Sequence, residues 1–225
     1  AVAGLEKRMA RRVEQGKMSA DDKDEIIGRI TVGSGYAAAS EADIVVEAIF
    51  EDMVIKKKTF AALDEAAPDR TIFASNTTSL SISEMASATS RPDKVCGMHF
   101  FNPPVVMKLV EIMPGIGTSQ ETVGAVSALA EKLGKKPVHA RFDSPAGIGS
   151  RVLAGSLNEA VEVFAQGLAS AEDIDAALKM GCGFPMGPLE LIDLIGVDIH
   201  LAKTETLYRE LGDQRYRPNF ILKKM

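Results

Sequence analysis

The hydrophobic and polar positions follow two different periods over the first two thirds of the chain. Short apolar runs rich in β-branched residues and bounded by polar residues, glycine or proline predict strands, here 30–32, 42–48, 70–75, 95–99, 109–113 and 138–140. Between them, apolar residues recur every three or four positions, which predicts helices over 1–16, 19–27, 51–67, 81–88 and 119–134. Strands that alternate with helices predict a doubly wound α/β sheet, and the continuous apolar run at 42–48 predicts a strand buried on both faces.

The pattern changes at about residue 145, beyond which no strand-like alternation occurs. Four segments with helical periodicity follow, at 151–166, 171–180, 188–195 and 197–211. We therefore predict an α/β domain over residues 1–144 and an all-α domain over residues 145–225, joined in the region 142–147.

Composition and charge argue against a nucleic-acid-binding protein and against a membrane protein. The net charge of −5 comes from 31 acidic and 26 basic residues without a block of like charges, which argues against a nucleic-acid surface. No apolar stretch approaches the length of about 18 residues that a membrane span needs, and the first 16 residues are charged and amphipathic. Cys96 and Cys182 lie in apolar sequence, so we expect two reduced core thiols. These features predict a cytoplasmic protein that binds neither membrane nor nucleic acid.

Two residues on neighbouring expected strands carry the strongest chemical signal. His99 ends a strand, at the edge where open α/β sheets bind ligands. Glu111 is a lone carboxylate in an apolar strand, where burial requires a hydrogen-bonded or charged partner. We expect one imidazole nitrogen to bond Glu111 and the other to face an open cleft, as in a proton-transfer dyad. A histidine satisfied within the core and a structural ion pair are the alternatives.

Other polar residues near strand ends carry a weaker signal. The residues 75–79 read SNTTS and could hold substrate groups, although such clusters are often turns and helix caps. Glu51 either interacts with the dipole of the helix that follows or faces a cofactor cleft. Lys56, Lys57 and Lys58 are more typical of a solvated helix face than of an anion site. The chain shows no metal-ligand spacing, and we expect no metal.

Five motifs in this order resemble the L-3-hydroxyacyl-CoA dehydrogenase family, most of all its bacterial 3-hydroxybutyryl-CoA branch. They are VVEAIFE at 45–51, SNTTSL at 75–80, HFFNPP at 99–104, KLVEI at 108–112 and GFPMGP at 183–188. The resemblance implies a Rossmann-like domain followed by a helical domain that forms a homodimer. It also implies NAD as the cofactor and an acyl-CoA thioester as the substrate, oxidised from 3-hydroxyacyl to 3-ketoacyl or reduced in the opposite direction.

The resemblance also assigns roles to single residues. It makes His99 the catalytic base and Glu111 its partner, and it places Asn102 in the catalytic site. Thr78 stands where the family has a serine and keeps its hydroxyl for catalysis and substrate binding. The implied cofactor contacts are Ala48, Glu51, Lys56 and Asn76.

The sequence also departs from the family pattern. The Gly-x-Gly-x-x-Gly turn that binds the pyrophosphate does not occur, and Gly33-Ser34-Gly35 does not replace it, so we expect the 225 residues alone to bind NAD poorly. Ser150 replaces a substrate-binding asparagine, and one extra residue stands near Phe142. We therefore expect the chain to be a fragment, a portion of a longer chain or a degraded family member. A catalytically silent structural protein and a module of a multifunctional fatty-acid oxidation chain remain alternatives to the free enzyme.

Overall fold

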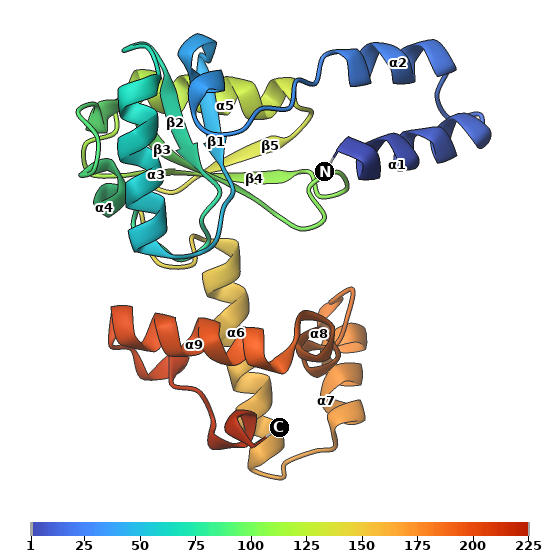
Figure 1. Cartoon of the computed structure of the whole chain (residues 1–225). Helices are drawn as coiled ribbons and strands as arrows, with labels where there is room; N and C mark the ends of the chain where they lie inside the picture. Colours follow the sequence, from blue (N-terminus) through green and yellow to red (C-terminus); the bar gives the residue numbers. More distant parts are fainter. Residues whose placement is uncertain (1, 225) are drawn as a thin grey trace.

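The computed structural model describes residues 2–224 and places an α/β half above a helical half (Figure 1). The first half contains, in order, α1 (Val2–Glu14), α2 (Ala20–Gly28), η1 (Ala37–Glu41), β1 (Ile44–Glu47), α3 (Met53–Ala66), β2 (Ile72–Ser75), α4 (Ile82–Ala86), η2 (Pro92–Lys94), β3 (Val95–Phe100), β4 (Leu109–Pro114), α5 (Gln120–Lys132) and β5 (Lys136–His139). The helices α1 and α2 form a hairpin that extends to one side of the sheet. The Rossmann-like fold class predicted from the sequence is confirmed.

The five strands form one mixed sheet in the order β1-β2-β3-β4-β5. The pairs β1–β2, β2–β3 and β4–β5 are parallel, whereas β3 and β4 are antiparallel because a short loop returns the chain directly beside β3. Alternate residues of these strands face opposite sides of the sheet. Phe73, Val95 and Met113 pack with α3 and α4, and Cys96 and Ile112 pack with α5. Helices therefore cover both faces, as expected for a doubly wound sheet.

Three local expectations are wrong. Residues 30–32 are not a strand, because no neighbouring strand pairs with them in residues 2–224, and Val32 is 76% exposed. Strand β1 lies at the edge of the sheet, so Val46 is exposed rather than buried on both faces. Cys96 is buried as expected, but Cys182 is exposed because it follows the last helical turn before the loop at residue 183.

The second half packs its helices around the long helix α6. Its elements are α6 (Gly149–Ala165), α7 (Ala171–Ala176), the π-helical turn η3 (Ala177–Gly181), α8 (Pro188–Ile195), α9 (Val197–Leu211), η4 (Gln214–Tyr216) and η5 (Phe220–Lys223). The helix expected over 171–180 thus ends as an α-helix at Ala176. Leu157 and Val161 of α6 bury against Ile192 and Leu222, which forms a separate apolar core for this half. None of the helices within residues 2–224 combines the length and the hydropathy that a membrane span requires.

The glycine before α8 has a steric reason. The Asp175 carboxylate accepts hydrogen bonds from the backbone N–H groups of Leu189 and Glu190, at 2.8 and 3.0 Å, and so satisfies two donors at the start of α8. A Cβ atom at Gly187 would overlap that carboxylate. The GFPMGP sequence therefore fixes the junction between α7 and α8.

We predict that His200 makes the stability of the protein depend on pH. Its imidazole is buried in α9, and its Nε2 finds no partner among the described residues. Burial, with a smaller contribution from Lys203, lowers the pKa of His200 to about 4. The unfolded chain takes up the proton near pH 6.5, so the stability from a neutral His200 is complete above that pH and is lost toward pH 4. The slope is at most about 1.4 kcal/mol per pH unit.

Urea unfolding at a series of pH values tests this prediction. The variant His200→Leu should lose that part of the pH dependence, whereas His139→Gln, at an exposed histidine, should keep it. Equal slopes for the wild type and His200→Leu would contradict the prediction.

Candidate active site

His99 and Glu111 face each other across the antiparallel pair β3–β4. The register places the two residues directly opposite, and both lie on the face of the sheet that also carries Val95 and Met113. His99 Nδ1 lies 3.1 Å from Glu111 Oε2, and both side chains are buried. The ring of His99 also packs against Phe101, with 4.9 Å between ring centroids. The contact predicted from the sequence is confirmed.

The helical half of the molecule provides a hydrogen bond to Oε1, the other carboxylate oxygen of Glu111. The backbone N–H of Gly149, at the start of α6, donates to Glu111 Oε1 at 2.6 Å. Burial alone would raise the pKa of Glu111, but the hydrogen bonds from His99 and Gly149 outweigh it and lower the pKa below its ordinary value. Glu111 is therefore an anion at neutral pH, which favours the tautomer of His99 with the proton on Nδ1 and makes Nε2 the nitrogen that can accept one.

His99 Nε2 contacts the loop that follows β2. Thr78 Oγ1 lies 3.2 Å from Nε2, so this nitrogen meets a hydroxyl rather than the open cleft expected from the sequence. Thr78 thus marks the position where a second hydroxyl, such as that of a substrate, could approach the base. The contacts Thr78–His99–Glu111 form a line from the loop to the buried carboxylate.

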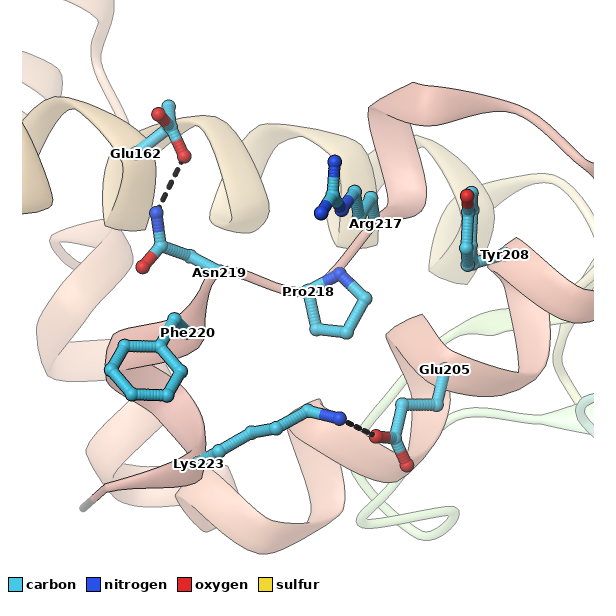
Figure 2. A pocket seen from close by; sticks show the side chains of 8 residues that line it. All are labelled: Glu162, Glu205, Tyr208, Arg217, Pro218, Asn219, Phe220 and Lys223. Atoms are coloured by element: carbon cyan, nitrogen blue, oxygen red, sulfur yellow. Dashed lines mark hydrogen bonds and ion pairs between the residues drawn. The ribbon is translucent and has the colours of Figure 1, made fainter.

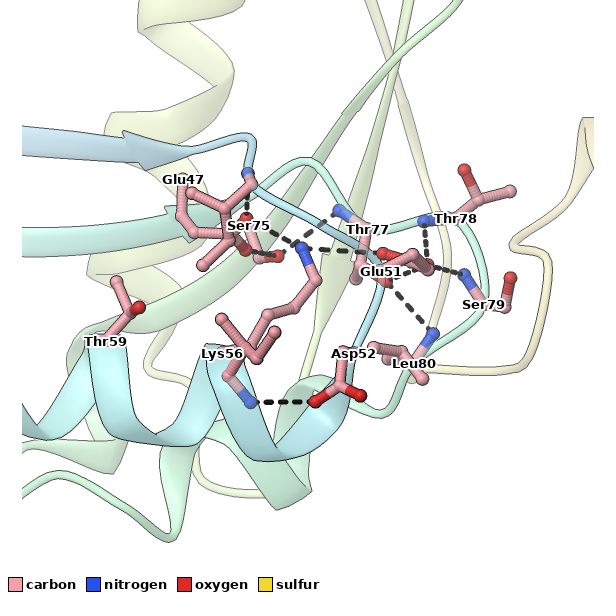
Figure 3. A network of polar contacts seen from close by, with 12 residues as sticks. Glu47, Glu51, Asp52, Lys56, Thr59, Ser75, Thr77, Thr78, Ser79 and Leu80 are labelled. Carbon is pink, nitrogen blue, oxygen red and sulfur yellow. Dashed lines mark hydrogen bonds and ion pairs between the residues drawn. The ribbon is translucent and has the colours of Figure 1, made fainter.

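Asn76 and Glu51 fix the shape of that loop. Asn76 Oδ1 accepts from the backbone N–H of Phe100 at 2.8 Å, which joins the carboxyl ends of β2 and β3. Glu51 Oε1 accepts from Thr77 Oγ1 at 2.6 Å and from the N–H groups of Thr78 and Ser79 at 3.1 and 3.0 Å (Figure 3). Glu51 therefore faces the loop, although Asp52, and not Glu51, caps α3.

Lys56 differs from the solvated lysine that its sequence context indicated. Its side chain is only 1% exposed, because the ammonium lies between two carboxylates, 2.6 Å from Glu47 Oε1 and 3.4 Å from Glu51 Oε2. Sequence reasoning did not identify Glu47 as a site residue. The signal was available, since Glu47 is a carboxylate that follows the apolar residues 44–46 within the expected strand.

Comparison with known proteins identifies the family. Residues 1–143 match the family model described as 3-hydroxyacyl-CoA dehydrogenase, NAD binding domain, and residues 148–225 match the model of the C-terminal domain of the same enzyme. The chain belongs to the 3-hydroxyacyl-CoA dehydrogenase family. It carries the NAD-binding domain of that family, and the two matches meet in the region where the sequence pattern changes.

Individual dehydrogenases are similar over nearly the whole chain. A probable 3-hydroxybutyryl-CoA dehydrogenase of Bacillus subtilis is 46% identical over 98% of this chain and 76% of its own length. A 3-hydroxybutyryl-CoA dehydrogenase of Clostridioides difficile is 46% identical over 100% of this chain and 79% of its own length. The crystal structure of the (S)-3-hydroxybutyryl-CoA dehydrogenase of Ralstonia eutropha superimposes with a TM-score of 0.96 at 42% identity, covering 100% of this chain and 79% of that one.

The remaining residues assigned by resemblance to the dehydrogenases differ in burial. Ala48 is exposed directly after β1, and Asn102 is exposed in the loop after β3. Ser150 is buried in the first turn of α6, next to the Gly149 N–H that holds Glu111. Their roles in binding cofactor and substrate stay predictions.

A separate pocket of about 640 Å³ lies in the helical domain (Figure 2). Its lining residues are Glu162, Glu205, Tyr208, Arg217, Pro218, Asn219, Phe220 and Lys223. Glu162 accepts from Asn219 at 2.6 Å, and Lys223 pairs with Glu205 at 2.7 Å, so much of its polar lining is already paired. It contains no residue of the line Thr78–His99–Glu111, so it is separate from the candidate active site at the strand ends.

Proposed function

We propose that the protein interconverts (S)-3-hydroxyacyl-CoA and 3-ketoacyl-CoA thioesters with NAD, and that short acyl chains such as 3-hydroxybutyryl are its substrates. The line of contacts from Thr78 through His99 to the buried Glu111 carries this proposal. The similarity to the 3-hydroxybutyryl-CoA dehydrogenases of Bacillus subtilis and Clostridioides difficile, each at 46% identity, supports the short chain length.

The residues present fit the nicotinamide end of NAD. Strands β1, β2 and β3 are mutually parallel, so their carboxyl ends meet at one edge, where the family has its cofactor cleft. The Glu51 side chain at this edge is 41% exposed and can accept from a ribose hydroxyl. The Asn76 oxygen is already bonded to Phe100, which leaves its amide as a possible donor to the cofactor. The sequence contains no glycine-rich turn for the pyrophosphate, and Gly33-Ser34-Gly35 lies outside any strand-to-helix turn.

Bound NAD supplies the hydride acceptor or donor, and the residues of this chain move the proton and orient the substrate. In the oxidation direction, His99 Nε2 takes the proton of the 3-hydroxyl group. Glu111 stabilises the imidazolium that results and keeps the ring in place across the 3.1 Å contact. Thr78 Oγ1, 3.2 Å from Nε2, holds the substrate oxygen beside the base.

The test measures the oxidation of NADH in the presence of acetoacetyl-CoA. The protein assayed is a fusion in which the N-terminal cofactor-binding segment of a family member precedes this chain. We expect turnover that requires both acetoacetyl-CoA and NADH. A folded fusion that binds NADH but does not reduce acetoacetyl-CoA would refute the proposal and favour a catalytically silent member. Comparing acyl chains of increasing length in the same assay tests the proposed preference for short chains.

We predict that Ser150→Asn raises kcat/KM for acetoacetyl-CoA about threefold to tenfold in this fusion. An asparagine side chain reaches farther than serine and adds an amide donor. One recovered hydrogen bond contributes about 0.5–1.5 kcal/mol. Ser156→Asn, on the exposed side of the same helix, is the control and should leave kcat/KM unchanged. An unchanged or lower value for Ser150→Asn would mean that position 150 does not face the substrate.

We also propose that the protein is a homodimer formed through the helices after residue 150. Large apolar side chains are exposed on this domain, namely Met180, Leu194, Ile199 and Phe220. Light scattering at micromolar concentration should report the mass of two chains, and a mass of one chain would contradict the proposal.

The free thiol of Cys96 in the core is compatible with a reducing compartment, and we propose a cytoplasmic location.

A further inference from the structure

Glu47, the last residue of β1, is a buried carboxylate whose two oxygens both accept hydrogen bonds. Oε1 accepts from Lys56 Nζ and from the N–H of Ile49, both at 2.6 Å, and Oε2 accepts from Ser75 Oγ at 2.6 Å. The Ser75 hydroxyl in turn accepts from the N–H of Thr77 at 3.2 Å. Figure 3 shows these contacts between the end of β1, the first turns of α3 and the end of β2. Glu47 thus joins three elements at the edge of the sheet where the active site lies.

Lys56 carries the contact from Glu47 to Glu51. Its ammonium lies between the two carboxylates, and its side chain has almost no access to water. A buried ammonium is stable only with a close counter-charge, and Glu47 is the closer and the more deeply buried of its two partners. Among residues 2–224, removing the charge of Glu47 therefore leaves Glu51 as the one carboxylate paired with Lys56 and draws Lys56 toward it.

Glu51 transmits any such shift to residues 77–79 after β2, which we call the catalytic loop. One of its oxygens faces Lys56, and the other accepts the three hydrogen bonds from Thr77, Thr78 and Ser79. These bonds outweigh the effect of burial and, with the charge of Lys56, lower the pKa of Glu51 below its ordinary value. The backbone N–H of Thr78 bonded to Glu51 belongs to the same residue whose hydroxyl contacts His99 Nε2 at 3.2 Å.

We propose that Glu47 is a positioning residue of the active site, which acts through Lys56 and Glu51 to hold the Thr78 hydroxyl at Nε2 of His99. This inference rests on the proposed function for its kinetic consequence, but the placement of Thr78 can be measured without turnover. Glu47 itself contacts neither His99 nor Thr78. A displacement of about 1 Å at a reacting group lowers rates by up to about a hundredfold, so a loosened loop has a large effect on kcat.

The alternative is that Glu47 only stabilises the fold, and a matched ion pair separates the two roles. Asp64 lies on the same helix α3 and pairs with Arg91 at 2.5 Å, with both side chains largely buried. Arg91 also lies over the ring of Phe73, in the core rather than at the catalytic loop. Asp64→Asn therefore removes a comparable charge from a comparable pair that has no contact with residues 77–79.

The experiment compares Glu47→Gln with Asp64→Asn in the fusion that carries the cofactor-binding segment. Glutamine keeps the shape and an acceptor oxygen but removes the charge. We expect both variants to lower Tm, but only Glu47→Gln to lower kcat, by about tenfold to a hundredfold at saturating substrate and cofactor. The ring ¹⁵N resonances of His99 are the second readout. The chain has only three histidines, and the Nε2 shift of His99 should move in Glu47→Gln and stay in place in Asp64→Asn.

The two readouts also separate this inference from the proposed function. If the wild-type fusion were inactive, the Nε2 shift alone would still test the inference. A wild-type Nε2 shift in folded Glu47→Gln would overturn it, as would a lowered Tm with unchanged kcat. Should Glu47→Gln fail to fold, Glu47→Asp keeps the charge but shortens the side chain by one methylene group, which draws the carboxylate away from Lys56. A smaller shift of the same Nε2 signal is then expected, and an unchanged signal would again overturn the inference.

Discussion

Replacing His99 by alanine is expected to lower kcat for acetoacetyl-CoA reduction by about 10²- to 10⁴-fold, the usual contribution of a general acid or base. We expect this large loss because His99 is the side chain that contacts both the Thr78 hydroxyl and the buried Glu111. Glu111 keeps its bond to the N–H of Gly149 in the variant, so its charge remains partly satisfied and the fold should persist. Steady-state kinetics of the fusion with the cofactor-binding segment measure the loss.

The matched control is His139→Ala, at an exposed histidine whose Nε2 contacts Ser127 instead of a carboxylate. That variant should keep the wild-type kcat. A loss below tenfold in folded His99→Ala would mean that His99 is a core histidine in a structural ion pair.

The pKa of Glu111 also limits how kcat can depend on pH. Since the pKa of Glu111 lies below its ordinary value of 4.5, Glu111 stays ionised as the pH falls to that value. A loss of wild-type kcat well above that pH therefore belongs to another group.

The contact between His99 and Glu111 could be predicted from the sequence because each residue carries a physical requirement. A carboxylate in an apolar strand needs a partner, and a histidine at the end of the neighbouring strand can provide it. Glu47 carries the same signal, but its partner Lys56 lies on a helix, where lysine side chains usually reach water. The burial of Lys56 follows from the packing of α3 on the face of the sheet, and local periodicity does not encode that packing.

The sequence pattern locates the strands along the chain, but it does not say which strands pair or in which direction. The sequence predicts β3 and β4 as strands, yet only the short return loop makes them antiparallel, and this sets the register of His99 against Glu111. The β-branched residues 30–32 show the converse case, since strand propensity alone does not form a strand where no neighbour pairs with it. The Gly149 contact with Glu111 joins two domains and depends on how α6 begins, which no sequence motif indicated.

Gly147, in the linker between the two domains, is also expected to be sensitive to substitution, although less so than His99. Its φ of +55° lies in the left-handed region, and a Cβ atom there would overlap Glu111 Oε2, the oxygen bonded to His99. Gly147→Ala therefore costs about 1–2 kcal/mol in backbone strain and also displaces the catalytic carboxylate. We expect kcat to fall by about tenfold to a hundredfold, because the carboxylate that orients the base moves.

Gly134→Ala separates the displacement of Glu111 from the backbone strain. Gly134 has a similar φ of +71°, but a Cβ atom there meets nothing within 4 Å. Both variants should lose a similar amount of stability from strain, seen as a lower free energy of unfolding in urea, and Gly147→Ala should lose more because of the overlap. Only Gly147→Ala should lower kcat and move the ring ¹⁵N signals of His99. Equal kcat values for the two variants would show that Glu111 can yield without cost to the base, and that the start of α6 does not hold the dyad in place.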